Sequence, residues 1–299
     1  MVLEEKGKNR NLSQGLLFFC YTLKKEIVDI DNYSFSSVSS NLYFNFTGKG
    51  VSMSDKVYAI FGANGGIGSA VAKLLAAQGH CVYLLGRSHE KLKILGDILG
   101  QPVKVAEATD ELQVRTCLEE IIEEKKTLDG VVSCIGSFHI KPLHMTSQVE
   151  FEQVMKTNAT SSFCILKAAC HLMAAHKQGS IVLCSSTAAL TGLASHEAIS
   201  AAKGAVASLI RSAAASYASK GVRVNGVAPG LTRTPMAHAI LSSESALKAS
   251  TAFHPLGRIG EPEDIAQAIV WLLQDTSSWI TGEVLAVDGG LSSLKTRMA

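Results

Sequence analysis

The stretch Val57–Gly68 reads VYAIFGANGGIG, an apolar run that passes directly into a glycine-rich turn. A helical pattern of apolar residues runs from Ile67 to Ala77, so the turn lies between an expected strand and an expected helix. Glycine lets a backbone turn sharply and approach a ligand closely, and a helix start offers free N–H groups and a positive dipole end. The stretch therefore predicts a dinucleotide-binding loop. Its expected binding residues are Gly62, Asn64, Gly66, Ile67 and Gly68.

Short apolar runs alternate with helical patterns along the rest of the chain. The expected strands are 57–61, 81–85, 103–106, 130–134, 180–184, 223–227 and 284–287. The expected helices are 67–77, 111–124, 150–176, 197–219 and 262–273. Strands that are apolar throughout and are separated by amphipathic helices indicate a parallel sheet covered on both faces. We predict one α/β domain over residues 53–299, a Rossmann-type doubly wound parallel sheet of about seven strands.

The second expected strand leads into Gly86, Arg87 and Ser88. Sites that select NAD place a carboxylate here, which accepts a hydrogen bond from the ribose 2′-hydroxyl. This chain has a glycine followed by an arginine, whose planar guanidinium is suited to a 2′-phosphate. Arg87 and Ser88 therefore favour NADP(H) as the cofactor.

Composition excludes several classes of protein. Hydrophobic residues make up 47% and charged residues 18% of the 299 residues, which is enough apolar material for a large core and excludes wholesale disorder. The net charge is +2 and no basic run exceeds two residues, so a nucleic-acid partner is not expected. Seven cysteines without a C-x-x-C pair favour free thiols in a reducing compartment over a disulfide framework or a metal site.

Residues 1–52 differ from the rest of the chain. They are rich in Ser, Asn and Tyr and lack sustained periodicity, so we expect a poorly ordered N-terminal extension. The apolar run 16–21 is too short to span a bilayer, and five acidic residues argue against a transit peptide. These observations predict a cytoplasmic protein that is not bound to a membrane.

Over residues 56–292 the chain resembles the short-chain dehydrogenase/reductase family, and in particular its 3-oxoacyl-carrier-protein reductases. The motifs that carry the resemblance are the G-x-x-x-G-x-G spacing of Gly62, Gly66 and Gly68, the strip Glu107–Asp110, the run SCIG that ends at Gly136, GVRVNGVAPG over 221–230, PLGR over 255–258, EPED over 261–264 and VDGG over 287–290. The resemblance implies that Ala108 and Gly136 belong to the cofactor site. It also implies that Pro229, Thr232 and Thr234 contact the nicotinamide end.

The resemblance further implies a catalytic group. In the family a serine orients the substrate oxygen, a lysine holds the ribose, and a helix asparagine holds a relay water; the matching residues are Ser186, Lys203 and Asn158. A tyrosine four residues before the lysine supplies or removes the hydroxyl proton. Ile199 occupies that position and has no proton to give. The usual catalytic group is therefore incomplete.

Two hypotheses follow from Ile199. In the first, His196 is the proton donor, because on a helix it would share the face of Lys203, seven residues later. In the second, the protein binds NADP(H) and turns substrate over slowly or not at all, since general acid catalysis is typically worth about 10²–10⁴-fold.

The leading hypothesis is an NADP(H)-dependent oxidoreductase that transfers hydride to or from a small carbonyl, alcohol or activated alkene. The alternative is a catalytically impaired NADP(H)-binding protein or scaffold. Helix 197–219 is rich in small residues, and in the family the equivalent helix forms subunit contacts, so a homodimer or homotetramer is expected.

Overall fold

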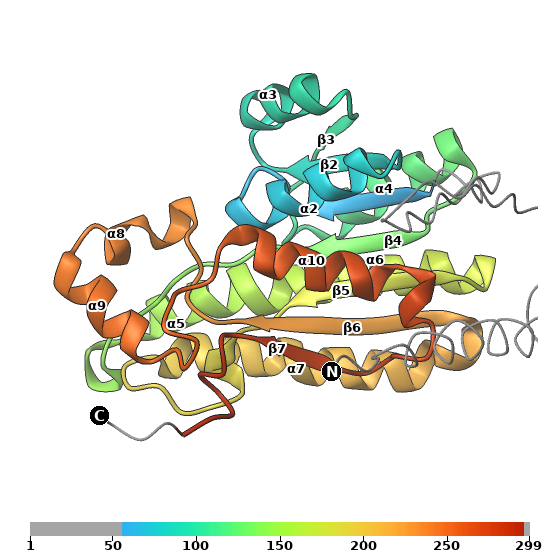
Figure 1. The fold of residues 1–299 in the computed structure, drawn as a ribbon. Coiled ribbons are helices and arrows are strands. Elements are labelled where there is room, and N and C mark those ends of the chain that lie inside the picture. The colour runs from blue at the N-terminus through green and yellow to red at the C-terminus, as the bar shows by residue number, and fades with distance from the viewer. Residues whose placement is uncertain (1–55, 296–299) are drawn as a thin grey trace, which may run out of the picture. The chain divides into compact units, whose positions relative to one another are not determined.

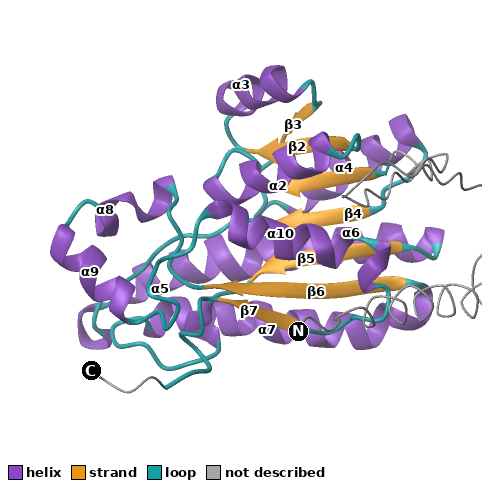
Figure 2. Ribbon diagram, viewed as in Figure 1, coloured by secondary structure: helices purple, strands orange, loops and turns teal. Residues whose placement is uncertain are grey.

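The computed structural model describes residues 56–295 (Figure 1). The N-terminal extension expected over residues 1–52 lies outside the described residues. The described part forms a layered α/β domain in which a sheet lies between two sets of helices (Figure 2). None of the helices in residues 56–295 is long and apolar enough to cross a membrane.

The sheet contains seven parallel strands in the order β3-β2-β1-β4-β5-β6-β7. Their bounds are β1 Val57–Phe61, β2 Cys81–Gly86, β3 Val103–Val105, β4 Gly130–Ser133, β5 Gly179–Cys184, β6 Val222–Pro229 and β7 Val284–Val287. The order reverses direction between β1 and β4, which makes a crevice at the carboxyl ends of these strands. The predicted doubly wound fold is confirmed.

Helices cover both faces of the sheet. Their bounds are α2 Gly66–Ala77, α3 His89–Leu99, α4 Glu111–Lys125, α5 Gln148–Met155, α6 Ser161–His176, α7 Glu197–Tyr217, α8 His238–Leu241, α9 Glu244–Ala252 and α10 Pro262–Leu273. Alternate residues of β1 point to opposite faces: Ala59 packs with α4, α6 and α7, whereas Ile60 packs with α2 and α10. Burial on both sides explains why the strands are apolar throughout.

The expected helix 150–176 is interrupted in the structure. α5 ends at Met155, a π-turn follows over Lys156–Thr160, and α6 begins at Ser161. Ser162 Oγ donates to the Asn158 carbonyl over 2.7 Å, and Asn158 Nδ2 donates to the Val154 carbonyl over 2.9 Å. Side-chain hydrogen bonds to helix carbonyls stabilise such a departure from regular α geometry.

Two regions of helix were not expected. α3 lies between β2 and β3, and the short helices α8 and α9 follow β6. α8 and α9 lie beyond the carboxyl ends of the strands, at the left in Figure 1.

Candidate functional site

The glycine-rich loop after β1 forms a close-packed backbone turn. Gly62 has φ +78°, and Gly65 N donates to its carbonyl over 3.0 Å. A methyl group on Gly68 would overlap the Gly62 carbonyl oxygen. A methyl group on Gly66 would lie 2.6 Å from Thr234 Cγ2, so two predicted cofactor residues from distant parts of the chain meet here. The glycines are needed because no larger residue fits the turn.

The start of α2 has no side-chain cap, and it directly follows the glycine-rich loop. Its N-cap residue Gly65 provides no side-chain cap, and its first turn contains no carboxylate. By contrast, a side chain caps α3, α4, α5 and α9; the four residues are Ser88, Asp110, Ser147 and Ser243. The first N–H groups of α2 lack intrahelical partners, and they meet the positive end of the helix dipole. This start therefore fits an anion such as a dinucleotide pyrophosphate.

The end of β2 leads to the expected adenosine side of the site. Asn64 Oδ1 lies 3.1 Å from the position that a methyl group on Gly86 would take, so the loop approaches β2 closely. The Arg87 side chain is 79% exposed, and its Nη1 lies 3.9 Å from Glu107 Oε2. Ser88 Oγ accepts from Lys91 N over 3.4 Å, which starts α3. Ala108 is buried beneath this region.

Three predicted residues, from the loop after β4, the π-turn and α7, lie together at Gly136. A methyl group there would lie 3.1 Å from Asn158 Oδ1 and 3.2 Å from Lys203 Nζ. Lys203 is buried, and its ammonium donates to the Cys184 carbonyl over 2.8 Å and to the Ile135 carbonyl over 3.3 Å. Burial lowers the pKa of Lys203. The amide of Asn158 is held by Ser137, whose backbone N–H donates to Oδ1 over 3.1 Å.

The remaining predicted cofactor residues lie on the segment that follows β6. Pro229 is the last residue of β6 and pairs with Val287. Thr232 Oγ1 donates to the Gly230 carbonyl over 3.0 Å, and Thr234 Oγ accepts from Ala237 N over 3.4 Å. These contacts fix the backbone of the segment at the carboxyl edge of the sheet, where Thr234 meets Gly66.

Ser186 begins a short turn just after β5. Its Oγ accepts from Ala188 N over 3.2 Å, so the hydroxyl proton remains available for another acceptor. The next residue, Thr187, donates through Oγ1 to Asp288 Oδ2 over 2.8 Å. Asp288 also accepts from Gly290 N and Ser292 N, each over 2.9 Å. The sequence identified the VDGG motif but gave Asp288 no role, because its partner Thr187 lies on a distant segment.

Asp288→Asn is expected to lower the free energy of unfolding at pH 7 by about 1–3 kcal/mol, because its amide would face the N–H donors of residues 290 and 292. Burial raises the pKa of Asp288, but hydrogen bonds from Ser292, Thr187 and Gly290 outweigh burial and lower it below 3.8. A lowered pKa stabilises the fold above the unfolded value and loses that effect as the pH falls through the folded value. Urea unfolding at pH 7 and pH 3 should therefore show a smaller acid-induced loss in the variant; an equal loss contradicts this role.

Ile199 lies on α7, one helical turn before Lys203. Its side chain is 5% exposed and packs in an apolar cluster with Val154, Ala198, Ala202 and Met155. Ile199 is therefore a packed hydrophobic side chain of the α5–α7 contact.

The structure places His196 differently from the sequence-based expectation. α7 begins at Glu197, and His196 is the N-cap with φ −113° and ψ 14°. His196 was expected to lie on the same helix face as Lys203. It precedes the first residue of the helix instead, so its backbone is not helical. Its Nδ1 lies 2.7 Å from the Ala194 carbonyl oxygen, a contact in which Nδ1 is the donor.

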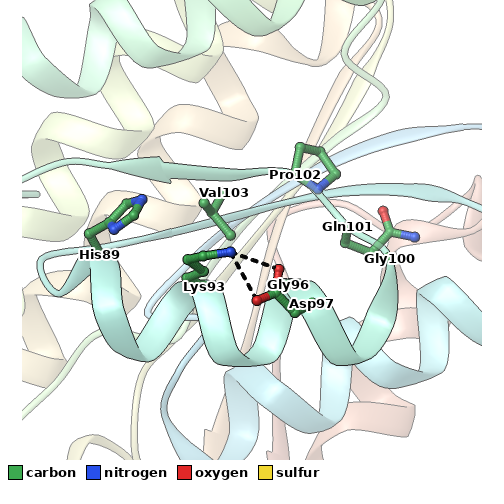
Figure 3. Close-up of a pocket in the computed structure, with 8 residues that line it drawn as sticks. All are labelled: His89, Lys93, Gly96, Asp97, Gly100, Gln101, Pro102 and Val103. Carbon is green, nitrogen blue, oxygen red and sulfur yellow. Dashed lines mark hydrogen bonds and ion pairs between the residues drawn. The ribbon is translucent and has the colours of Figure 1, made fainter.

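A hollow lies on the outer side of the domain, apart from this convergence. It is formed by α3 and the start of β3, and its lining residues are His89, Lys93, Gly96, Asp97, Gly100, Gln101, Pro102 and Val103 (Figure 3). Lys93 Nζ and Asp97 Oδ2, 3.0 Å apart, form an ion pair along its wall. None of the predicted site residues lines it.

The parallel sheet, the uncapped glycine-rich helix start and the buried lysine together define a Rossmann-type dinucleotide-binding domain. Residues 62–292 match the family model described as enoyl-(acyl carrier protein) reductase. The 3-oxoacyl-[acyl-carrier-protein] reductase of Bos taurus is 35% identical over 239 residues, which cover 79% of this chain and 98% of that protein. The chain belongs to the short-chain dehydrogenase/reductase family, which binds NAD(P)(H).

Solved structures agree with this assignment. A short-chain type dehydrogenase/reductase from Mycobacterium ulcerans has a TM-score of 0.77 and 32% identity, with 80% of this chain and 90% of that chain covered. ElxO with NADP bound has a TM-score of 0.75 and 30% identity, covering 80% and 100%. A variant of ElxO with phenylalanine in place of one tyrosine was solved with NADPH bound. The predicted family and its resemblance to 3-oxoacyl-carrier-protein reductases are confirmed.

Proposed function

We propose that the protein is an NADP(H)-dependent oxidoreductase that transfers hydride to or from the carbonyl or alcohol carbon of a small molecule. The observation that carries the proposal is the convergence of Asn158 and Lys203 on Gly136, at the sheet edge where α2 begins without a cap. The free N–H groups of α2 neutralise a pyrophosphate, and Arg87 pairs with a 2′-phosphate. The nicotinamide of the bound cofactor supplies or receives the hydride.

Ser186, Lys203 and Asn158 each have a distinct role in the proposal. Ser186 donates its hydroxyl proton to the substrate oxygen and so orients it. Lys203 places a buried positive charge near the site and holds the ribose. Hydrogen bonds from its ammonium to the backbone carbonyls of residues 135 and 184 fix the position of its side chain. Asn158 positions a water that can relay a proton. The substrate oxygen therefore meets donors on several sides.

Ile199 supports the second candidate, a protein that binds NADP(H) but turns substrate over slowly. Its hydrocarbon side chain is packed against Val154, and it cannot exchange a proton. The NADPH-bound variant of ElxO supports cofactor binding by a family member in which one tyrosine has lost its hydroxyl. The two candidates share the cofactor site and differ in the rate of the proton transfer.

His196 remains the proposed alternative to the missing tyrosine, and the hydrogen bond of its ring restricts the role. With the proton on Nδ1, neutral imidazole can accept a proton at Nε2, as oxidation of an alcohol requires. Reduction of a carbonyl would instead require the doubly protonated ring.

Arg87→Ala is expected to weaken NADPH binding by about 10–100-fold and to leave NADH binding unchanged, because a hydrogen bond to a charged group contributes about 1.5–3 kcal/mol. Glu107→Gln is expected to strengthen NADPH binding a few-fold, since the Glu107 carboxylate lies 3.9 Å from the guanidinium and repels a phosphate. Fluorescence titration with both cofactors measures the two dissociation constants.

Arg115→Ala is the matched control, because Arg115 is another exposed arginine with an acidic partner, Glu119 on α4. It should leave both dissociation constants as they are. A parallel loss of NADPH and NADH affinity in Arg87→Ala would overturn the NADP preference, and failure of both cofactors to bind the native chain would overturn the proposed function.

We also propose that the protein is a homodimer or homotetramer in the cytoplasm and takes a small-molecule substrate. The oligomer is supported by the large exposed apolar side chains of Phe151 on α5 and Phe163 on α6, which flank α7. A reducing compartment is supported by the buried thiols of Cys117, Cys164 and Cys170.

A further inference from the structure

Two thiols lie side by side at the carboxyl edge of the sheet. Cys184 is the last residue of β5, and Cys134 directly follows β4. The parallel register pairs Ser133 with Leu183, so the next residue of each strand is one of the two cysteines. Their Sγ atoms lie 3.9 Å apart, which is hydrogen-bond distance for sulfur.

The backbone already has the spacing of a disulfide. Neighbouring strands lie about 4.7–4.9 Å apart, within the range of about 4.4–6.8 Å between the Cα atoms of bridged cysteines. Both side chains pack on the same face of the sheet, beneath α2 and α10. The Sγ atoms need to approach from 3.9 Å to about 2.05 Å, which rotation of the side chains and a small movement of the strand ends supply.

The surroundings favour a thiolate at this pair. Lys203 Nζ lies 2.8 Å from the Cys184 carbonyl and 3.3 Å from that of Ile135, the neighbour of Cys134. The hydrogen bond with Cys134 lowers the pKa of Cys184, burial opposes this effect, and the Lys203 charge adds to it. The same hydrogen bond and burial raise the pKa of Cys134, so Cys184 is the thiol of the pair that ionises first.

Other thiols of the described domain have a different environment. Burial raises the pKa of Cys170 to about 12, and its side chain is almost completely enclosed by α6 and its neighbours. Cys117 lies on α4, and its Sγ is 3.7 Å from the Val105 carbonyl. Cys134, by contrast, is only partly buried, so this residue is partly open to a small oxidant.

We propose that Cys134 and Cys184 form a reversible disulfide on exposure to a hydroperoxide. One thiolate attacks a peroxide oxygen, the O–O bond breaks, and the leaving oxygen takes a proton to give an alcohol, or water from hydrogen peroxide. The resulting sulfenic acid is attacked by the second sulfur, the S–S bond forms, and water leaves. Two thiols are oxidised by two electrons, and one peroxide is reduced.

The disulfide is expected to weaken dinucleotide binding, and this second part rests on the proposed function. A methyl group on Gly62 would lie 3.1 Å from the Cys134 carbonyl carbon, so the pair adjoins the first glycine of the cofactor loop. Drawing the two strand ends together moves the carbonyl groups that hold Lys203. We expect the dissociation constant for NADPH to rise by about ten-fold, the effect of about one displaced hydrogen bond.

Mass spectrometry of the full chain tests the modification. The protein is treated with hydrogen peroxide, its remaining thiols are alkylated in denaturant, and it is digested without reductant. The expected product is a peptide pair joined through Cys134 and Cys184, lighter by two hydrogens than the separate peptides and released by dithiothreitol. Cys117→Ala should still give it. Oxidation to sulfenic or sulfinic acid without this cross-link would overturn the proposal.

Titration with NADPH before and after peroxide tests the consequence. The native chain should lose affinity and recover it with dithiothreitol, whereas Cys134→Ser and Cys184→Ser should each keep the affinity that they have before treatment. An unchanged affinity in the cross-linked native chain would overturn the link to the cofactor. If the reduced chain binds no NADPH, the proposed function fails, and the cross-link is still decided by its mass.

Discussion

Replacing Ile199 with tyrosine is expected to raise the rate of NADPH-dependent reduction of small ketones by about 10²–10⁴-fold, the usual worth of a general acid. The new hydroxyl would lie one helical turn before Lys203, whose buried positive charge favours the ionised form of a neighbouring phenol. Steady-state oxidation of NADPH over a panel of carbonyl compounds measures the gain. The larger ring enters the cluster with Val154 and Met155, so a cost of about 1–3 kcal/mol in stability accompanies it.

Ile199→Phe is the matched control, because it adds the same ring without the hydroxyl. Both variants should show the same loss of stability, and only the tyrosine should gain activity. Equal rates of NADPH oxidation for the two variants would show that a missing proton donor is not what limits the reaction. His196→Ala in the native chain separates the hypotheses further: an unchanged rate of alcohol oxidation would leave that histidine no role in proton transfer.

Gly68→Ala is expected to abolish detectable NADPH binding and to destabilise the domain by several kcal/mol. The added methyl group would overlap the carbonyl oxygen of Gly62, and both belong to the backbone, so the turn itself must open. Overpacking typically costs about 1–3 kcal/mol, and displacement of the turn also removes the N–H groups aimed at the pyrophosphate. Isothermal titration and urea unfolding measure the two effects.

Gly204→Ala provides the comparison within the same fold. Gly204 lies inside α7, and a methyl group there would meet no atom within 4 Å. Alanine should stabilise this helix by about 0.5–1 kcal/mol and leave NADPH binding intact. If the two substitutions affect binding equally, the close approach at Gly68 is not what forms the cofactor loop.

The strands were predictable because burial on both faces of the sheet makes each strand a continuous run of apolar residues. Tyr58 and Ile60 face one layer of helices and Ala59 and Phe61 the other, so every position of β1 is apolar. The expected bounds of β1 and β7 are those of the structure, and the other strands differ by one to two residues at an end. The glycine loop was predictable for the same kind of reason, because its requirement for small residues is local.

α3 was missed although its two ends carry readable signals. Ser88 caps its start, and Gly100 ends it with φ 64°. Only Leu92 and Gly96 of this helix are buried, and two of its large apolar residues, Ile94 and Ile98, are exposed. Capping residues would have located the helix where periodicity did not.

The finer features of the site depend on contacts between distant residues. The site combines residues that are far apart in the chain: Gly136, Asn158 and Lys203. Only the family resemblance, and no local sequence pattern, predicted that they belong to one site. The Arg87–Glu107 ion pair has no sequence signal of its own. The position of His196 depends on Ser195, which has φ 62° although serine rarely adopts this conformation.

Because of the π-turn between α5 and α6, the number of residues in this segment affects the geometry of the site. Each residue of a regular α-helix turns the chain by about 100°, since a turn contains about 3.6 residues. The wider loop at 156–160 absorbs an additional residue, so α5 and α6 each keep their buried stripe while the amide of Asn158 is rotated toward Gly136. The direction of the Asn158 amide thus depends on the number of residues in this segment. A shorter segment with the same side chains would turn the amide away from Gly136.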